Sequence, residues 1–142
     1  TGTDVGTVYA IDPATGVSTL LGTTLGQVNS LAFGADGTLY LTTYAALGAL
    51  RTLSPAGLFA NVATGLSYPS SIEYDALNQR LLVFAEISGN GTLYGIDPDN
   101  GAKMTLSSGH TFIAGWATTS MLTDGVHVVG VVDGDNISLL LP

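Results

Sequence analysis

The chain has 142 residues, of which 46% are hydrophobic and only 10% are charged, with eleven acidic residues against three basic ones. This composition excludes sustained disorder, and the net charge of -8 argues against binding to the phosphate backbone of nucleic acids. The absence of cysteine excludes disulfides and cysteine-ligated metal centres.

Short segments rich in Val, Leu, Ile, Tyr and Thr follow one another along the chain, separated by turn residues such as Asp-Gly. Such dipeptides supply the positive φ angles of tight hairpins. No segment shows the i, i+3, i+4, i+7 spacing of an amphipathic helix over a helical length. The sequence therefore predicts an all-β fold with thirteen strands, which in chain order cover residues 8–12, 18–23, 29–33, 39–43, 50–54, 59–64, 70–74, 81–86, 93–97, 103–107, 114–119, 126–132 and 137–141.

An internal repeat groups these strands. Residues 6–13, Gly-Thr-Val-Tyr-Ala-Ile-Asp-Pro, recur at 91–98 as Gly-Thr-Leu-Tyr-Gly-Ile-Asp-Pro, and a weaker copy covers 48–55. In a second register, Val-Asn-Ser-Leu-Ala-Phe at 28–33 matches Pro-Ser-Ser-Ile-Glu-Tyr at 69–74. Four prolines at positions 13, 55, 98 and 142 are spaced 42, 43 and 44 residues apart. A four-stranded unit of about 43 residues has the size of a β-propeller blade.

The repeat divides the chain into whole and partial blades. We predict a partial blade over residues 1–27 with the third and fourth strands, complete blades over 28–68 and 69–113, and a partial blade over 114–142 with the first three strands. Thirteen strands cannot be divided into blades of four, and an open ring leaves sheet edges unpaired. We therefore expect about three blades of a β-propeller that another chain or a missing segment completes, making the protein part of an oligomer or of a longer chain.

The stretch Leu-Ala-Phe-Gly-Ala-Asp-Gly-Thr-Leu-Tyr at 31–40, together with the Tyr-x-Ile-Asp-Pro-x-x-Gly unit, resembles bacterial propeller repeats of the NHL, YWTD and gluconolactonase-like (SMP-30-like) superfamily. The resemblance covers nearly the whole chain at the level of the fold and implies six or seven blades in the complete ring. This superfamily includes lactonases, lyases, binding modules and scaffolds, so the fold alone does not choose among these functions.

The resemblance also implies where ligands bind. In such propellers the ligand face is formed by the loops from the fourth strand to the next blade and from the second strand to the third. Here these are residues 24–28, 66–69 and 108–113, and residues 44–48, 87–91 and 133–136. We expect Tyr44, Tyr68, His110 and Trp116 as ligand-binding candidates on or near this face. The two loop tyrosines could stack on a sugar ring or on the backbone of a partner, whereas blade packing alone could explain Trp116.

Gluconolactonase-like enzymes hold a divalent metal in the central channel, and the resemblance implies Glu86, Asp133 and Asp135 as candidate ligands. Residues 133–136, Asp-Gly-Asp-Asn, also look like a fragment of a calcium-binding loop, since calcium prefers several oxygen ligands. Turn formation explains the same residues without a metal. His110 is the better placed of the two histidines for catalysis, but no Gly-x-Ser-x-Gly motif accompanies it. We assign no catalytic residue.

These observations favour a non-catalytic binding or scaffold module that is part of a larger extracellular β-propeller and whose partner is the rest of that propeller. The alternatives are a metal-dependent gluconolactonase-like hydrolase, with Ca²⁺ as its candidate ion, and a carbohydrate-binding propeller. Few lysines, many Thr, Ser and Gly residues and the acidic balance suit an extracellular, cell-surface or periplasmic location. No apolar run reaches the roughly 18 residues of a membrane helix, so we expect no membrane embedding.

Overall fold

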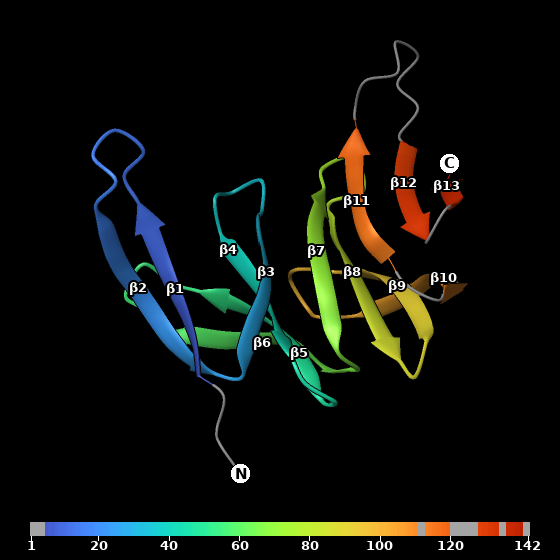
Figure 1. Ribbon diagram of the computed structural model, residues 1–142, viewed down its shortest axis with the longest axis horizontal. Helices are drawn as coiled ribbons and strands as arrows, with labels where there is room; N and C mark the ends of the chain where they lie inside the picture. The colour runs from blue at the N-terminus through green and yellow to red at the C-terminus, as the bar shows by residue number, and fades with distance from the viewer. Residues whose placement is uncertain (1–4, 111–112, 120–127, 134–135, 141–142) are drawn as a thin grey trace.

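The structure is a computed structural model that describes residues 5–110, 113–119, 128–133 and 136–140 (Figure 1). For the last three segments, and for Leu25, it describes the backbone alone. The described residues form thirteen strands and no helix, and so contain no helix that could cross a membrane. The strands are β1 (Val5–Ile11), β2 (Ser18–Leu25), β3 (Gln27–Phe33), β4 (Leu39–Tyr44), β5 (Gly48–Leu53), β6 (Phe59–Leu66), β7 (Pro69–Asp75), β8 (Arg80–Ile87), β9 (Asn90–Ile96), β10 (Lys103–His110), β11 (Ile113–Thr119), β12 (Val128–Asp133) and β13 (Asn136–Leu140).

The strands form four antiparallel sheets in which each strand pairs with its neighbours in the sequence. Two sheets have four strands, in the orders β3-β4-β5-β6 and β7-β8-β9-β10. A two-stranded sheet of β1 and β2 precedes them in the chain, and a three-stranded sheet of β11, β12 and β13 follows them. The prediction of an all-β fold with four-stranded units and partial units is therefore confirmed.

The connections between successive sheets are shorter than the sequence indicates. Gly26, at a φ of 93°, is the single residue between β2 and β3, where the sequence predicts a loop over residues 24–28. Two residues, Ser67 and Tyr68, connect β6 to β7. Glycine reaches positive φ without steric cost, so the chain turns at Gly26 and the flanking residues stay in the strands.

Two turns that the sequence repeats also have the same structure. The carboxylates of Asp12 and Asp97 each accept a hydrogen bond, 2.9 Å long, from the backbone N–H two residues further on. Gly16 and Gly101 end these turns with φ angles of 71° and 72°. An Asp side chain that bonds to the backbone favours a turn, and glycine tolerates the left-handed conformation that closes it.

The larger core lies between the two four-stranded sheets. The sheet from β3 to β6 contributes buried Tyr40 and Leu50, and the sheet from β7 to β10 contributes Leu81, Val83 and Ile96. Side chains alternate along each strand, so one side of a sheet can pack against the sheet before it and the other against the sheet after it. The three residues from the later sheet are fully buried, each with an exposed fraction of 0%.

A smaller core joins the sheet of β1 and β2 to the sheet that follows it. Val8 of β1 packs with Leu41 of β4 and Leu53 of β5. Arg51 of β5 also reaches this interface and donates a hydrogen bond from Nη1 to the Thr24 hydroxyl on β2. The sheets thus stack face to face in the order of the sequence.

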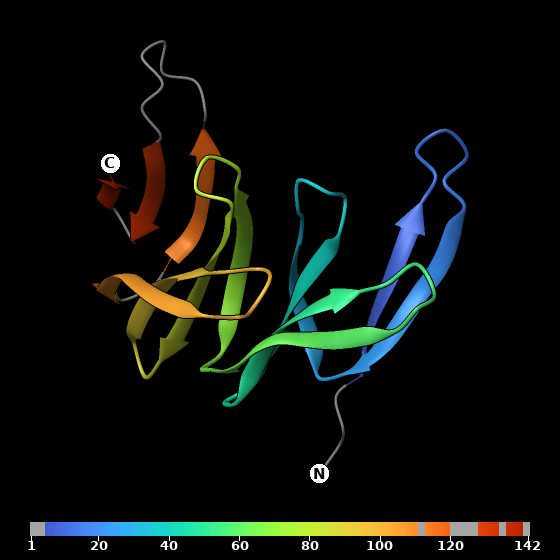
Figure 2. The same cartoon turned by 180° about the vertical axis from the view of Figure 1, so that it is seen from behind.

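The first strands of successive sheets lie side by side: β3 contacts β7, and β7 contacts β11. The view from behind brings β6 and β10, the fourth strands of their sheets, toward the viewer (Figure 2). The first strand of each four-stranded sheet is therefore the inner one and the fourth is the outer one. Because equivalent strands have the same place in each sheet, the loops that follow them lie at the same end of the sheets.

Candidate functional site

Hydrogen bonds hold together the loops at one end of the two four-stranded sheets, toward the lower edge of Figure 1. We call this end the loop face and define it as residues 44–48, 66–69, 86–91 and His110. The carbonyl of Ala45 accepts hydrogen bonds from the N–H groups of Gly48, at 3.0 Å, and Tyr68, at 2.8 Å. The carbonyl of Ser67 accepts one from the N–H of Glu86 at 2.9 Å. Three loops from two sheets are thereby fixed relative to one another.

Tyr44 and Tyr68 form an aromatic pair on the loop face. Their ring centroids lie 5.2 Å apart, and the ring planes are tilted by 52°. Such spacing and tilt are favourable for aromatic rings. The exposed fractions of the two residues are 41% and 37%, so the pair remains accessible from solvent. The structure thus brings together two residues that the sequence predicts only as separate candidates.

The backbone of Tyr68 has a φ of 43°, in the left-handed region that a tyrosine rarely adopts. The hydrogen bond to the Ala45 carbonyl and the buried Pro69 that follows hold it there. A non-glycine residue pays of order 1 to 2 kcal/mol for this conformation. The backbone that carries the Tyr68 ring is therefore held by contacts with the neighbouring loop.

Two further apolar side chains are exposed on the loop face near the tyrosines. Leu47, in the loop from β4 to β5, has an exposed fraction of 85%, and Ile87, at the end of β8, has one of 57%. No pattern in the sequence singles out either residue, although both fall in or beside loops that it predicts. Together with the tyrosines they add exposed apolar surface to this face.

Glu86 and His110 lie in one row across the neighbouring strands β8, β9 and β10, each paired with Gly91. The missing side chain of Gly91 leaves room for the ring of Phe84, which occupies the position where a Cβ atom would lie. The carboxylate of Glu86 accepts a hydrogen bond from the N–H of Gly89 at 3.2 Å. This bond closes the turn between β8 and β9, which is a structural use for Glu86.

His110 lies at the end of β10 and is partly buried. Its Nε2 atom lies 2.8 Å from the hydroxyl oxygen of Ser107. The sequence shows serines close to His110, but only the bulges in the pairing of β10 with β9 reveal which serine meets the ring. The contact orients the imidazole. It does not bring His110 into the tyrosine pair, which belongs to the preceding loops.

The metal-binding prediction depends on residues that the structure describes only in part. Among the described residues, no group of three or more His, Cys, Asp or Glu side chains is arranged to hold a metal ion. Asp133 is the last residue of β12, where the backbone alone is described, and Asp135 lies outside the described residues. Trp116 lies in β11, where the side chain is likewise not described. The proposed metal ligands and the role of Trp116 stay predictions.

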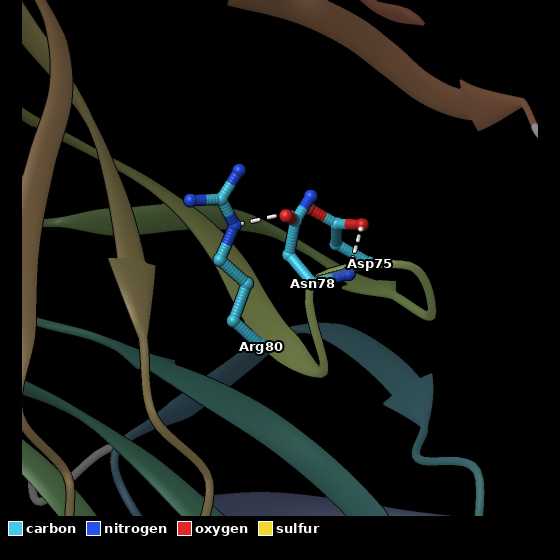
Figure 3. A network of polar contacts seen from close by, with 3 residues as sticks. All are labelled: Asp75, Asn78 and Arg80. Carbon is cyan, nitrogen blue, oxygen red and sulfur yellow. Dashed lines mark hydrogen bonds and ion pairs between the residues drawn. The ribbon is translucent and has the colours of Figure 1, made fainter. Parts of the chain in front are cut away.

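A partly buried ion pair between Asp75 and Arg80 (Figure 3) lies at the turn from β7 to β8, at the opposite end of the sheets from the loop face (Figure 1). Asp75, with an exposed fraction of 0%, accepts hydrogen bonds from Arg80 Nε at 3.0 Å and from Asn78 Nδ2 at 2.8 Å. Burial raises the pKa of Asp75, but the hydrogen bonds from Asn78 and the charge of Arg80 lower that pKa more, so it lies below its usual value. The network anchors the turn from β7 to β8.

Comparisons with known proteins bear on the fold. No protein-family model and no curated protein matches the chain. Among solved structures, it is similar to the extracellular domain of a putative one-component system from B. thetaiotaomicron, with a TM-score of 0.65 and 17% identity over 96% of this chain. It is also similar to TolB from Acinetobacter baumannii, with a TM-score of 0.65 and 16% identity over 96% of this chain. A protein from Lactobacillus plantarum matches with a TM-score of 0.53 and 17% identity, over 94% of this chain and 49% of that one.

The chain spans 20% and 38% of the first two of these structures. Together with the stacked four-stranded sheets, the similarities show a β-propeller-like fold made of whole and partial blades. Identities of this size carry information on the fold alone. The finer resemblance to NHL, YWTD and gluconolactonase-like repeats stays a prediction.

Proposed function

We propose that this chain is a non-catalytic binding module and one part of a larger extracellular or periplasmic β-propeller. The incomplete first sheet and the similarity to much longer solved structures support the second half of this proposal. The sequence resemblance to bacterial propeller repeats supports six or seven blades in the complete ring. The rest of that propeller is then the main partner of the chain.

The aromatic pair on the loop face carries the proposal of binding. Tyr44 and Tyr68 lie against each other and are both more than a third exposed, so each presents part of its ring to solvent. Hydrogen bonds between the loops hold the backbone beneath the rings, so little side-chain and loop ordering is needed when a ligand binds. A rigid, amphipathic surface of this kind suits the apolar face of a sugar ring, with the phenolic hydroxyls free to bond to its hydroxyl groups.

The described polar side chains on this face give less support to catalysis. The Glu86 carboxylate closes a turn, and the His110 ring meets Ser107 at the end of another strand. A general base and a nucleophile must both reach a common substrate atom. We therefore propose carbohydrate binding at the tyrosine pair in preference to a hydrolase reaction at Glu86.

A glycan array followed by calorimetric titration of the best glycan tests this proposal. We expect Tyr44→Ala and Tyr68→Asn each to weaken binding of that glycan at least about tenfold, because each removes one ring of the pair. Asparagine tolerates the left-handed backbone at position 68 and so keeps the loop.

Tyr9→Ala is the matched control, because Tyr9 is also exposed, at 55%, but lies on β1 away from the loop face. A blank array at high protein concentration would contradict carbohydrate binding. Equal loss of affinity in the Tyr9 variant would contradict the location of the site.

A further inference from the structure

Large apolar side chains are exposed on β1, β2 and β3, where no described sheet covers them. Tyr9, Ile11 and Leu20, with exposed fractions of 55%, 65% and 56%, lie on the face of the first sheet opposite to Val8. Leu31 and Phe33, with exposed fractions of 48% and 67%, lie on the face of the next sheet that also carries Leu41 and looks toward the first sheet. We call these two surfaces together the open side. The part formed by Leu31 and Phe33 is continuous with the smaller core, because β3 and β4 also carry the residues that pack around Val8. Exposed apolar surface of this extent usually marks an interaction site.

The internal repeat shows that these positions are made to be covered. Ile11 matches Ile96, whose exposed fraction is 0%, and Leu31 matches Ile72, whose exposed fraction is 5%. Phe33 matches Tyr74, which is partly buried against the larger core. In the later sheet these residues pack against the sheet that precedes it. The first two sheets carry the same residue types without the same covering.

The turn glycines show the same difference between repeat positions. A Cβ atom on Gly101 would collide with the carbonyl oxygen of Val62 in the preceding sheet. A Cβ atom on Gly16, at the matching position and with almost the same φ, would meet nothing within 4 Å. The turn that ends at Gly101 therefore abuts the preceding sheet, and the turn that ends at Gly16 faces open space.

The edge of β1 also has unused pairing capacity. The equivalent strands β5 and β9 each have a partner on both sides, whereas β1 pairs with β2 alone among the described strands, apart from an isolated bridge between Val5 and Gly26. An uncovered strand edge presents backbone N–H and C=O groups that can pair with another strand. The free edge of β1 is the edge at which β4 joins β5 and β8 joins β9.

A cavity marks where the absent strands would lie. Between β2 and the following sheet there is a hollow of about 520 Å³, lined mainly by apolar groups that include Leu21, Phe33, Leu53 and Pro55. The corresponding hollow between the two four-stranded sheets is about 220 Å³. There, Gly34, Ala35 and Asp36 line it from the turn that connects β3 to β4. The first sheet lacks such a turn because it lacks the first two strands of a blade.

We infer that a β-hairpin from a different polypeptide segment binds the free edge of β1 and supplies the first two strands of that blade, covering Leu31 and Phe33. This inference rests on the proposed place of the chain in a larger propeller and specifies how the chain joins it. The hairpin runs antiparallel to β1 with its second strand. Its turn fills the cavity beside Phe33.

The residues of β3 and β4 indicate the chemistry of the hairpin. In the larger core, Tyr40 and the partly buried Ala32 are the side chains that β4 and β3 direct at the following sheet. Tyr40 lies opposite Thr52 of β5, and Ala10 of β1 is the residue that matches Thr52 in the repeat. The second strand of the hairpin therefore carries an aromatic or large aliphatic residue opposite Ala10. Its first strand carries a small residue, as β3 carries Ala32. Its other face, beside Tyr9 and Ile11, is also apolar because it adjoins the preceding blade.

A second copy of this chain fits the open side less well. The first two strands of its last sheet are β11 and β12, and β12 already pairs with β13 over five residue pairs. The edge of β12 that would have to join β1 is therefore occupied. For the copy to bind as the hairpin does, β13 would have to separate from β12 and lose that ladder.

An extended chain tests the inference with a hairpin taken from the protein itself. A second copy of residues 27–43 is attached before Thr1, so that all 142 residues are kept. We expect amide hydrogen exchange in β1 to slow at least about tenfold and the thermal midpoint to rise, because the hairpin pairs with β1 and buries Leu31 and Phe33. Mass spectrometry of peptides from residues 5–11 measures the exchange.

The matched control carries Tyr40→Asp in the added copy only, which keeps the length and the turn but places a charge against the apolar surface. Slower exchange in β1 that is lost in this control supports the inference. Unchanged exchange in the extended chain overturns it, as does a dimer of the natural chain in which the β1 amides are protected. Glycan binding at Tyr44 and Tyr68 is a separate measurement, so either proposal can fail without the other.

Discussion

Asp75 shows how one residue can link the stability of this fold to pH. Its carboxylate is buried and accepts hydrogen bonds from Asn78 and Arg80, and its pKa in the folded chain lies below the usual value of 3.8. A lowered pKa means that the folded state favours the ionised form. The resulting stability is fully present above the unfolded-state pKa and is lost as the pH falls through the folded-state pKa.

We expect Asp75→Asn to lower the free energy of unfolding at pH 7 by about 1 to 3 kcal/mol, because a charged acceptor of several hydrogen bonds is lost. The variant should also lose less additional stability than the natural protein as the pH falls below about 4. Urea denaturation at a series of pH values measures both effects. Parallel stability curves for the two proteins across that range would contradict the assignment.

Residues of the candidate site differ in how far the sequence could reveal them. Tyr44 and Tyr68 stand out because loops leave aromatic side chains with no core to enter. Their contact could not be predicted, because it depends on the hydrogen bonds that join two loops and on the left-handed backbone of Tyr68. The role of Glu86 in the turn that follows it is equally hidden, since a carboxylate at the end of a strand looks the same in the sequence whether it binds a metal or a backbone N–H.

At the scale of the element, strands β1 to β10 follow from the alternation of apolar residues and from the turns that separate them. The limits of the prediction lie at the strand ends. The sequence places residues 24–28 in a loop, but the turn needs only Gly26, because its left-handed backbone reverses the chain in one residue. A turn of this kind depends on backbone angles, which the residue types around Gly26 do not reveal.

Equivalent strands of different sheets should respond differently to the same substitution. Ile96 on β9 is fully buried, and Ile11 on β1 is 65% exposed. We expect Ile96→Ala to cost about 2 to 5 kcal/mol, as for other buried large-to-small changes. Ile11→Ala should cost about 0.5 kcal/mol or less.

Chemical denaturation of the two isoleucine variants measures these differences, with the far-ultraviolet circular dichroism spectrum as a check that each variant is folded. An equal cost for both variants would show that β1 is already covered in solution. That result would disagree with the burial found at these two positions.

At the scale of the whole molecule, protection against hydrogen exchange should follow the distribution of the core. The two four-stranded sheets share the larger core, whereas the sheet of β1 and β2 contributes Val8 to the smaller one. Regions with few buried contacts open at a lower free energy than the core. We expect peptides from residues 5–25 to exchange at least about tenfold faster than peptides from residues 81–96.

This exchange experiment uses the unmodified chain at a concentration where its sedimentation profile shows one species. Uniform protection along the chain would contradict the expected gradient. The repeat predicts the blade-like units behind this gradient, because residues that recur every 42 to 44 positions fold into equivalent strands. The repeat does not predict what covers the sheet of β1 and β2, because none of the repeated segments is left over to pack against it.

The hydrogen bond from Arg51 to Thr24 bears on the order in which similar sheets can stack. Thr24 pairs with Gly6 as Leu66 pairs with Gly48, so the two residues hold equivalent places in successive sheets. If copies of this chain exchanged sheets, and a second four-stranded sheet took the place of β1 and β2, Arg51 would meet the apolar side chain of Leu66. A partly buried guanidinium without its acceptor is costly. This one polar contact therefore acts against domain swapping among sheets that otherwise resemble one another.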